Sequence, residues 1–182
     1  MKGIIVYKGK YGATAQYASW LGIELQIPVI KLDDITIETL LCYDYIIMGS
    51  SVYVGKLQAR AWIAENSDIL QEKKVFFFIV CATPEDRKDK IAEIIKNNIP
   101  ASLNTEHNVF IMRGRMIMAK LSRLDRFMLK MGARLQKNPA ERKRMLQDFD
   151  EVKPGSIVPL LKSVQSLNSK LADLPDNLHC LV

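Results

Sequence analysis

Residues 8–14 form the first segment whose residue types suit ligand binding, and they read Lys-Gly-Lys-Tyr-Gly-Ala-Thr. Glycine lets the backbone approach a ligand closely, and a loop that opens a helix offers backbone N–H groups to an anion. The two lysines add positive charge, and the threonine adds a hydroxyl donor. The segment suits a phosphomonoester, while a tight turn with two solvated lysines accounts for it equally well. The candidate contacts are Lys8, Gly9, Lys10, Tyr11, Gly12, Ala13 and Thr14.

Two later segments add the features of a pocket for a planar ring. Gly49 and residues 50–56 combine small hydroxylated residues, one aromatic residue and a second glycine. Residues 81–84 (Cys-Ala-Thr-Pro) end another apolar run. A ring between these segments would stack on Tyr53, and backbone groups would bind its polar edge. The candidate ring contacts are Ser50, Ser51, Val52, Tyr53, Val54, Gly55, Ala82 and Thr83.

The spacing of these residues excludes several other kinds of site. Residues 8–14 fit neither the G-x-G-x-x-G dinucleotide fingerprint nor the Walker phosphate loop. The acidic pair that a receiver domain carries after its first strand is absent from the sequence. No Ser/His/Asp set and no metal-ligand spacing is visible, so neither hydrolysis nor a metal site is predicted. His107 and His179 are isolated and are interpreted as surface or structural residues.

Strands and helices must position the three loops. Apolar runs at residues 2–7, 28–32, 44–49, 74–81 and 108–113 predict five buried strands. Helices are predicted at 13–25, at 36–41, near 57–69, from 84 to about 97 and at 156–171, with a loop at 50–56 and a frayed end after 171. Apolar strands that alternate with helices indicate a parallel sheet covered on both faces, a three-layer α/β sandwich. Ligands of such sheets bind at the carboxyl ends of the strands, where the three loops lie.

Composition indicates one domain over residues 1–182. Apolar residues make up 48% of the chain and charged residues 25%, which argues against global disorder. No apolar run reaches the length of about 18 residues expected of a membrane span, and Lys8 interrupts the first run too early for a signal peptide. Cys42, Cys81 and Cys180 share no disulfide or zinc spacing, so a cytoplasmic location is expected.

Positive charge is concentrated in one part of the sequence. The formal net charge is +6, yet residues 113–144 hold eleven basic residues against Asp125 and Glu141. This local charge of +9 leaves −3 for the rest of the chain. Residues 114–150 are therefore interpreted as a basic helical insert after the fifth strand, and the charge asymmetry suggests a binding partner.

The insert has the pattern of an amphipathic helix. One predicted stripe is apolar: Leu121, Leu124, Met128, Met131 and Leu135. The opposite stripe is basic: Arg123, Arg126, Lys130, Arg134 and Lys137. Three interpretations stay open: packing on its own domain, docking on an anionic membrane surface, and binding of an acidic partner or nucleic acid. Nucleic acid is the least favoured, because the insert holds almost no aromatic residue for base stacking.

The first two interpretations are compatible if the helix lines a mouth through which a hydrophobic, polyanionic substrate enters. A tetrapyrrole with two propionates fits that description, and so does a quinone reached from the bilayer. The residues expected to face the membrane or the substrate are Arg123, Arg126, Phe127, Lys130 and Arg134.

Together the strands and loops resemble the flavodoxin family, whose loops bind flavin mononucleotide (FMN). The likeness is closest to the flavodoxin-like protoporphyrinogen IX dehydrogenases that use a quinone or menaquinone. Gly12 and Thr14 match their phosphate motif S-T-x-D-G-x-T. Gly49, Ser51 and Gly55 match their ring motif G-x-S-I-x-Y-G. Residues 125–128 (Asp-Arg-Phe-Met) match the D-R-F-M of their basic insert, which short flavodoxins lack.

Three departures from these motifs lie in the cofactor loops. Lys8 and Gly9 replace the hydroxyl pair of the phosphate loop, and Ala13 replaces its usual Asn or Gln. Tyr53 lies one position earlier than the aromatic residue of the ring loop. Lysine charge would offset the lost hydroxyl donors as a point charge and not as a shaped donor set.

The resemblance implies a flavodoxin-like sheet of order 2-1-3-4-5 with FMN at its carboxyl edge. It also implies oxidation of protoporphyrinogen IX, with electrons passed to a quinone at the inner face of the cell membrane. A flavodoxin-type electron carrier or generic flavin-dependent reductase is the alternative, although carriers usually present an acidic face. A third hypothesis is a docking module that has lost tight flavin binding.

Overall fold

The computed structural model describes residues 1–84, 86–105 and 107–172. His179, Cys180 and the end expected to fray beyond residue 172 lie outside the described residues. In the part that is described, no helix is both long and apolar enough to cross a membrane. No group of three or more His, Cys, Asp or Glu side chains in that part is arranged to hold a metal ion.

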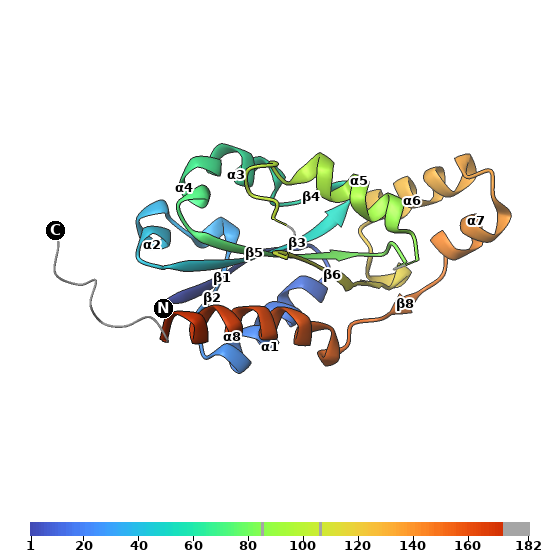
Figure 1. The fold of residues 1–182 in the computed structure, drawn as a ribbon. Helices are drawn as coiled ribbons and strands as arrows, with labels where there is room; N and C mark the ends of the chain where they lie inside the picture. Colours follow the sequence, from blue (N-terminus) through green and yellow to red (C-terminus); the bar gives the residue numbers. More distant parts are fainter. Residues whose placement is uncertain (85, 106, 173–182) are drawn as a thin grey trace.

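Five strands of the central sheet are parallel and lie, within the described residues, in the spatial order β2-β1-β3-β5-β6. They are β1 (Gly3–Lys8), β2 (Val29–Lys31), β3 (Tyr45–Tyr53), β5 (Lys74–Cys81) and β6 (Val109–Arg113). Ile5 of β1 lies opposite Ile47 of β3, which lies opposite Phe76 of β5. The predicted order 2-1-3-4-5 is confirmed, and the carboxyl ends of β1, β3 and β5 meet at one edge (Figure 1).

Helices cover both faces of the sheet and complete three layers (Figure 1). One face carries α1 (Ala13–Leu25), the 3-10 helix η3 (Pro154–Ile157) and α8 (Val158–Ala172). The other carries η1 (Leu32–Asp34), α2 (Ile37–Leu41), α3 (Arg60–Glu65), α4 (Ser67–Gln71) and α5 (Lys88–Asn98). Alternating strand residues serve the two cores: Ile4 and Phe77 face α2–α5, whereas Ile5 and Phe78 face α1 and α8. The predicted three-layer sandwich is confirmed.

Residues 50–57 form a hairpin where a loop over 50–56 was predicted. β3 continues to Tyr53, and the short strand β4 (Lys56–Leu57) pairs with it antiparallel. The prediction of a loop was wrong because Leu57 is buried in the core and Ser50 is also buried, which requires backbone pairing. The hairpin therefore holds the ring segment on the sheet.

The helix predicted near 57–69 is two helices. Asn66 has φ −111° and ψ 20°, outside the helical range, and separates α3 from α4. Its side chain donates to the carbonyl of Trp62 at 2.8 Å, a local bond that competes with helix continuation. The helix predicted from residue 84 begins at Lys88, four residues later.

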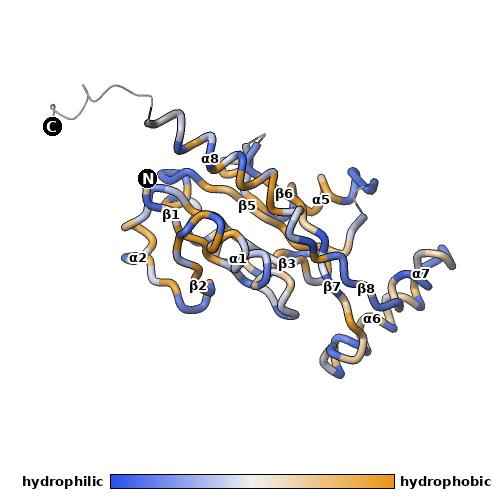
Figure 2. Tube along the Cα trace, turned by 90° about the horizontal axis from the view of Figure 1, so that it is seen from below, coloured by the Kyte–Doolittle hydropathy of each residue, from blue (hydrophilic) through white to orange (hydrophobic). Residues whose placement is uncertain are grey.

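The insert leaves the sheet after β6 and returns before α8. The strands β7 (Arg115–Met116) and β8 (Phe149–Asp150) pair antiparallel and bracket it. Between them lie η2 (Met118–Lys120), α6 (Arg123–Leu135) and α7 (Pro139–Met145). Figures 1 and 2 show α6 and α7 beyond the carboxyl edge of the sheet, outside both helical layers.

The helix α6 packs on the domain through a face that the two predicted stripes did not include. Asp125 and Ala133 are buried, and Leu129 and Gly132 are half-buried beside them. The apolar residues Leu124, Phe127, Met128, Met131 and Leu135 are exposed instead. At 100° per residue these positions form three faces, which are buried, apolar and basic.

Candidate functional site

The first candidate loop connects β1 to α1 through two constrained glycines. Gly12 has φ +86° and precedes the first turn of α1, a conformation that side chains other than glycine rarely adopt. A Cβ atom added to Gly9 would lie 2.5 Å from Oγ1 of Thr14. Thr14 is buried beneath the loop. The first N–H groups of a helix have no intrahelical acceptors, so this corner offers donors to an anion.

The second candidate loop is the turn of the β3–β4 hairpin. Val54 (φ 49°) and Gly55 (φ 73°) separate the paired residues Tyr53 and Lys56. Two central residues with positive φ fit the type I′ turn that follows the twist of a hairpin. Because Val54 is β-branched, its positive φ is strained. Its side chain is 69% exposed. The turn holds the backbone of Tyr53 at the edge of the sheet.

The third candidate loop follows β5 and is held by β6. The Arg113 guanidinium donates to the carbonyl of Thr83, and its Nε donates to Glu151 at 2.5 Å. Cys81 is buried at the start of the loop, and burial raises the pKa of its thiol. A buried thiol of this kind packs as a small hydrophobic residue.

One cavity of about 440 Å³ brings the three loops together with the insert. Its volume lies within the range of about 300–1,000 Å³ that is usual for small-molecule sites. Nine predicted cofactor contacts line it: Tyr11, Ala13, Thr14, Ser51, Val52, Tyr53, Val54, Ala82 and Thr83. The insert supplies another part of the lining, which includes Leu121, Asp125, Met128, Leu129 and Gly132. The lining pairs a polar corner at α1 with an apolar slot, which suits a planar ring that carries an anionic tail.

The other predicted contacts do not line this cavity. Lys8 pairs with the exposed Asp33 at 2.7 Å, and Ser50 is buried, where its hydroxyl accepts from the N–H of Ala59 at 3.1 Å. The backbone conformations of Gly9, Gly12 and Gly55 shape the loops. Lys10 contacts Asp125 of the insert and does not line the cavity. The predicted cofactor roles of all these residues stay predictions.

The insert residues predicted to face a membrane or a substrate lie outside the cavity lining. Arg123, Phe127, Lys130 and Arg134 are exposed, whereas Arg126 is half-buried. The Arg126 guanidinium turns back toward η2 and donates to the carbonyl of Ala119 at 3.3 Å. It therefore supports the start of α6, and the other four project from the helix into solvent.

The insert is joined to the cofactor loops through one carboxylate. Asp125 of α6 is 6% exposed and accepts hydrogen bonds from the hydroxyls of Tyr11 and Tyr53, the second at 2.6 Å. Lys10 Nζ lies 2.6 Å from the same carboxylate and over both tyrosine rings, 5.0 Å from the centroid of Tyr53. Ser122 caps α6 by accepting from the Asp125 N–H at 3.1 Å. We call Lys10, Tyr11, Tyr53 and Asp125 the latch.

The charges of the latch support one another. Hydrogen bonds from Lys10, Tyr11 and Tyr53 hold the pKa of Asp125 well below its ordinary value. The hydrogen bond from Lys10 to Asp125 raises the pKa of the Lys10 amine, and the hydrogen bond from Tyr53 to Asp125 raises the pKa of the Tyr53 hydroxyl. At neutral pH the latch therefore holds an ionised carboxylate on Asp125, a protonated amine on Lys10 and a neutral phenol on Tyr53. The third residue of a helix also favours a carboxylate, because it lies at the positive end of the helix dipole.

Asp125 was missed as a site residue, although the sequence carried two signals for it. It is one of two acidic residues in a strongly basic segment, and Ser122 with Asp125 has the spacing of a capping box. Arg113 and Gly114 were also missed, because the end of the fifth strand holds no motif. These residues meet the loops only through tertiary packing.

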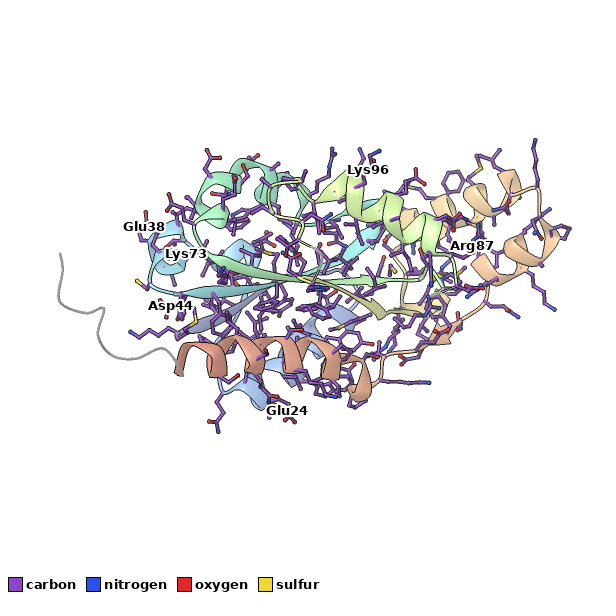
Figure 3. All side chains as sticks on the ribbon, in the orientation of Figure 1. Glu24, Glu38, Asp44, Lys73, Arg87 and Lys96 are labelled. Atoms are coloured by element: carbon purple, nitrogen blue, oxygen red, sulfur yellow. The ribbon has the colours of Figure 1, made fainter. Side chains whose placement is uncertain are left out.

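A second cavity of about 460 Å³ adjoins the first. The two share Ala82, Thr83, Met116, Leu129, Met145 and Phe149. The rest of its lining is mostly basic, and we call Arg87, Lys90, Arg113 and Arg144 its basic wall; Asp148 and Glu151 are the acidic residues there. The Arg113 guanidinium lowers the pKa of Glu151, so this acid stays charged and offsets part of the positive charge. Figure 3 shows Arg87 at the end of the molecule that carries the insert.

A parallel sheet with a cavity at the carboxyl ends of its central strands defines a cofactor-binding α/β domain. The family model of the flavodoxin domain matches residues 4–143. The chain belongs to this flavodoxin domain family. No curated protein sequence matches it significantly.

Solved structures of several flavodoxins are similar to this chain. Oxidised flavodoxin 2 from Bacillus cereus is 22% identical with a TM-score of 0.46, over 62% of this chain and 84% of that one. A flavodoxin from the domain Archaea is 19% identical with a TM-score of 0.44, over 80% and 93%. A Fusobacterium nucleatum flavodoxin bound to flavin mononucleotide is 15% identical with a TM-score of 0.38, over 54% and 67%.

The latch predicts an asymmetry between two aspartates. Asp125→Asn removes the charge that Lys10 and the phenols stabilise, so the free energy of unfolding should fall by about 2 kcal/mol. Asp33→Asn breaks an exposed pair with Lys8 and should cost less than about 0.5 kcal/mol. Urea unfolding of both variants measures the difference. Equal losses in the two variants would contradict a stabilising role for the latch.

The latch also predicts the direction of a pH effect. Because the folded pKa of Asp125 is depressed, its contribution is complete above the ordinary value of 3.8 and is lost as the pH falls below it. The stability difference between the wild type and Asp125→Asn should hold from about pH 8 to 5 and shrink below about pH 4. Urea unfolding across this range tests it, and a difference at about pH 2 as large as the difference at about pH 5 would exclude the linkage.

Proposed function

We propose that this chain is an FMN-dependent oxidoreductase that binds its cofactor in the cavity at the carboxyl edge. Membership of the flavodoxin domain family supports this, as does the FMN bound in the Fusobacterium flavodoxin. The observation that carries the proposal is the joint lining of one cavity by all three predicted loops and the insert. FMN supplies the redox chemistry, and the chain supplies binding, orientation and exclusion of water.

Each part of FMN has different residues of the cavity as its proposed contacts. The phosphate belongs at the N-terminus of α1, where Ala13 and Thr14 line the polar corner. The ring belongs in the apolar slot between the hairpin with Tyr53 and the loop with Ala82 and Thr83. Because both lysines of the first loop pair with aspartates, backbone N–H groups and the Thr14 hydroxyl are left as the phosphate donors.

The position of the insert favours an enzyme over an electron carrier. A carrier must bring the edge of its ring close to a partner protein. Here Leu121, Met128 and Leu129 cover the cavity, and the latch holds their helix in place. A small molecule can reach a ring beneath such a cover, whereas a folded protein surface cannot.

Protoporphyrinogen IX is the substrate proposed for this enzyme, with a membrane quinone as the electron acceptor. The resemblance to the flavodoxin-like protoporphyrinogen dehydrogenases motivates the choice, and the second cavity supports it. Its apolar part adjoins the proposed ring site, and its basic wall suits the two propionates of a tetrapyrrole. The proposed product is protoporphyrin IX.

Cofactor binding is tested by comparing FMN with riboflavin, which lacks the phosphate. FMN fluorescence should be quenched on titration with the protein. Thr14→Val removes one hydroxyl donor and should weaken FMN about tenfold, while riboflavin binding stays unchanged. Equal weakening of both ligands would place the phosphate elsewhere, and no quenching at saturation would exclude FMN as the cofactor.

Substrate oxidation is tested by anaerobic turnover of protoporphyrinogen IX with menaquinone on the FMN-loaded protein. Arg144→Glu alters the basic wall and should raise KM about tenfold, the effect of one charged contact. Arg142→Glu changes the same short helix outside both cavities and should leave KM unchanged. No turnover by an FMN-loaded protein that exchanges electrons with redox proteins would support the carrier alternative.

A further inference from the structure

The helix α6 exposes an apolar stripe that no part of the described chain covers. Leu124 is 65% exposed, Phe127 61%, Met131 42% and Leu135 80%. Their spacing of three, four and four residues places them along one side of the helix. We call these four residues the apolar stripe. Large apolar side chains gathered in this way indicate a surface that is covered in the working state.

A second stripe on the same helix is basic. Arg123, Lys130, Arg134 and Lys137 are exposed, and none of them forms an ion pair with another described residue. On the neighbouring helix α7, Arg142, Lys143 and Arg144 are exposed as well. We call the four residues on α6 the basic stripe. A helix with parallel apolar and basic stripes is suited to lie in the plane of an anionic lipid surface.

The charge of the insert selects among the surfaces that could cover the apolar stripe. A symmetric contact between two copies would place the basic stripes near each other, and like charges oppose that contact. An anionic bilayer instead attracts the basic stripe while its acyl chains receive the apolar side chains. We propose that α6 docks this protein on an anionic membrane surface through the apolar and basic stripes.

Docking in this way leaves the packing of α6 intact. The third face of the helix holds Asp125 and Ala133, which are both buried, and Asp125 is bound there by Lys10, Tyr11 and Tyr53 of the domain. The latch therefore keeps α6 on the domain while the other two faces meet lipid. The same helix forms one side of the 440 Å³ cavity, so docking brings that cavity next to the bilayer. The docking proposal depends on neither cofactor nor substrate.

Vesicle sedimentation of the full chain tests the proposal. Vesicles of phosphatidylcholine with phosphatidylglycerol should bind the protein, and vesicles of phosphatidylcholine alone should bind it far less. Lys130→Glu with Arg134→Glu should weaken binding at least about 25-fold, since each basic group near the surface contributes about fivefold. Phe127→Ser with Leu135→Ser should weaken it at least about tenfold.

Matched variants control for net charge and for surface hydrophobicity. Lys96→Glu with Lys162→Glu makes the same charge change outside the insert, on α5 and α8. Figure 3 shows Lys96 away from the insert. Ile23→Ser removes an apolar residue that is 69% exposed on α1. Both controls should bind vesicles like the wild type, and urea unfolding confirms that each variant folds.

Three results would overturn the proposal. The wild type fails to bind anionic vesicles at low salt, or the stripe variants and their controls lose binding equally. The third is a dimer of the wild type in sedimentation velocity that Phe127→Ser with Leu135→Ser converts to a monomer. In that case the apolar stripe would be covered by a second copy of the chain.

Discussion

The arrangement of this protein depends on a buried carboxylate that must be neutralised. Asp125 reaches the carboxyl edge of the sheet from an insert more than one hundred residues away in sequence from Lys10 and Tyr11. A buried charge without partners is costly, so the insert is stable in this position only while both cofactor loops supply donors. The loops gain equally, because the same contacts fix the Tyr53 side chain and Lys10. The cavity is therefore a joint product of the sheet edge and the insert.

The need to neutralise Asp125 determines what the two lysines of the first loop, Lys8 and Lys10, contact. As a sequence, the two lysines look like a replacement for the hydroxyl donors that bind a phosphate. In the folded chain Lys10 neutralises Asp125, and Lys8 lies beside Asp33 on the surface. The anion site is left to the start of α1, where oriented N–H groups act with the Thr14 hydroxyl. The loop thus combines a neutral corner for the ligand with a charged contact to the insert.

Local pattern was sufficient to predict the five strands and α1, because each strand is a continuous apolar run and α1 begins and ends as its spacing predicts. The spatial order of the strands was predicted from the resemblance to flavodoxins. Local pattern failed where a tertiary contact decides the structure. Val54 has a positive φ that β-branched residues avoid, so no propensity indicates the hairpin turn. Asp125 contacts residues that are distant in sequence, and no periodicity records such a contact.

The two predicted stripes on α6 show that an amphipathic pattern does not by itself identify the side of a helix that packs on the domain. A helical wheel of α6 separates its apolar positions from its basic ones, and the apolar side of such a helix is usually expected to pack against the core. Here the packed side is narrow and holds Asp125 beside Leu129, Gly132 and Ala133, because the domain offers this side two phenols and an amine. Docking on lipid through the outward sides would then leave the cavity covered from above. A substrate would have to enter from the flank, where the second cavity meets the first at Met116 and Phe149.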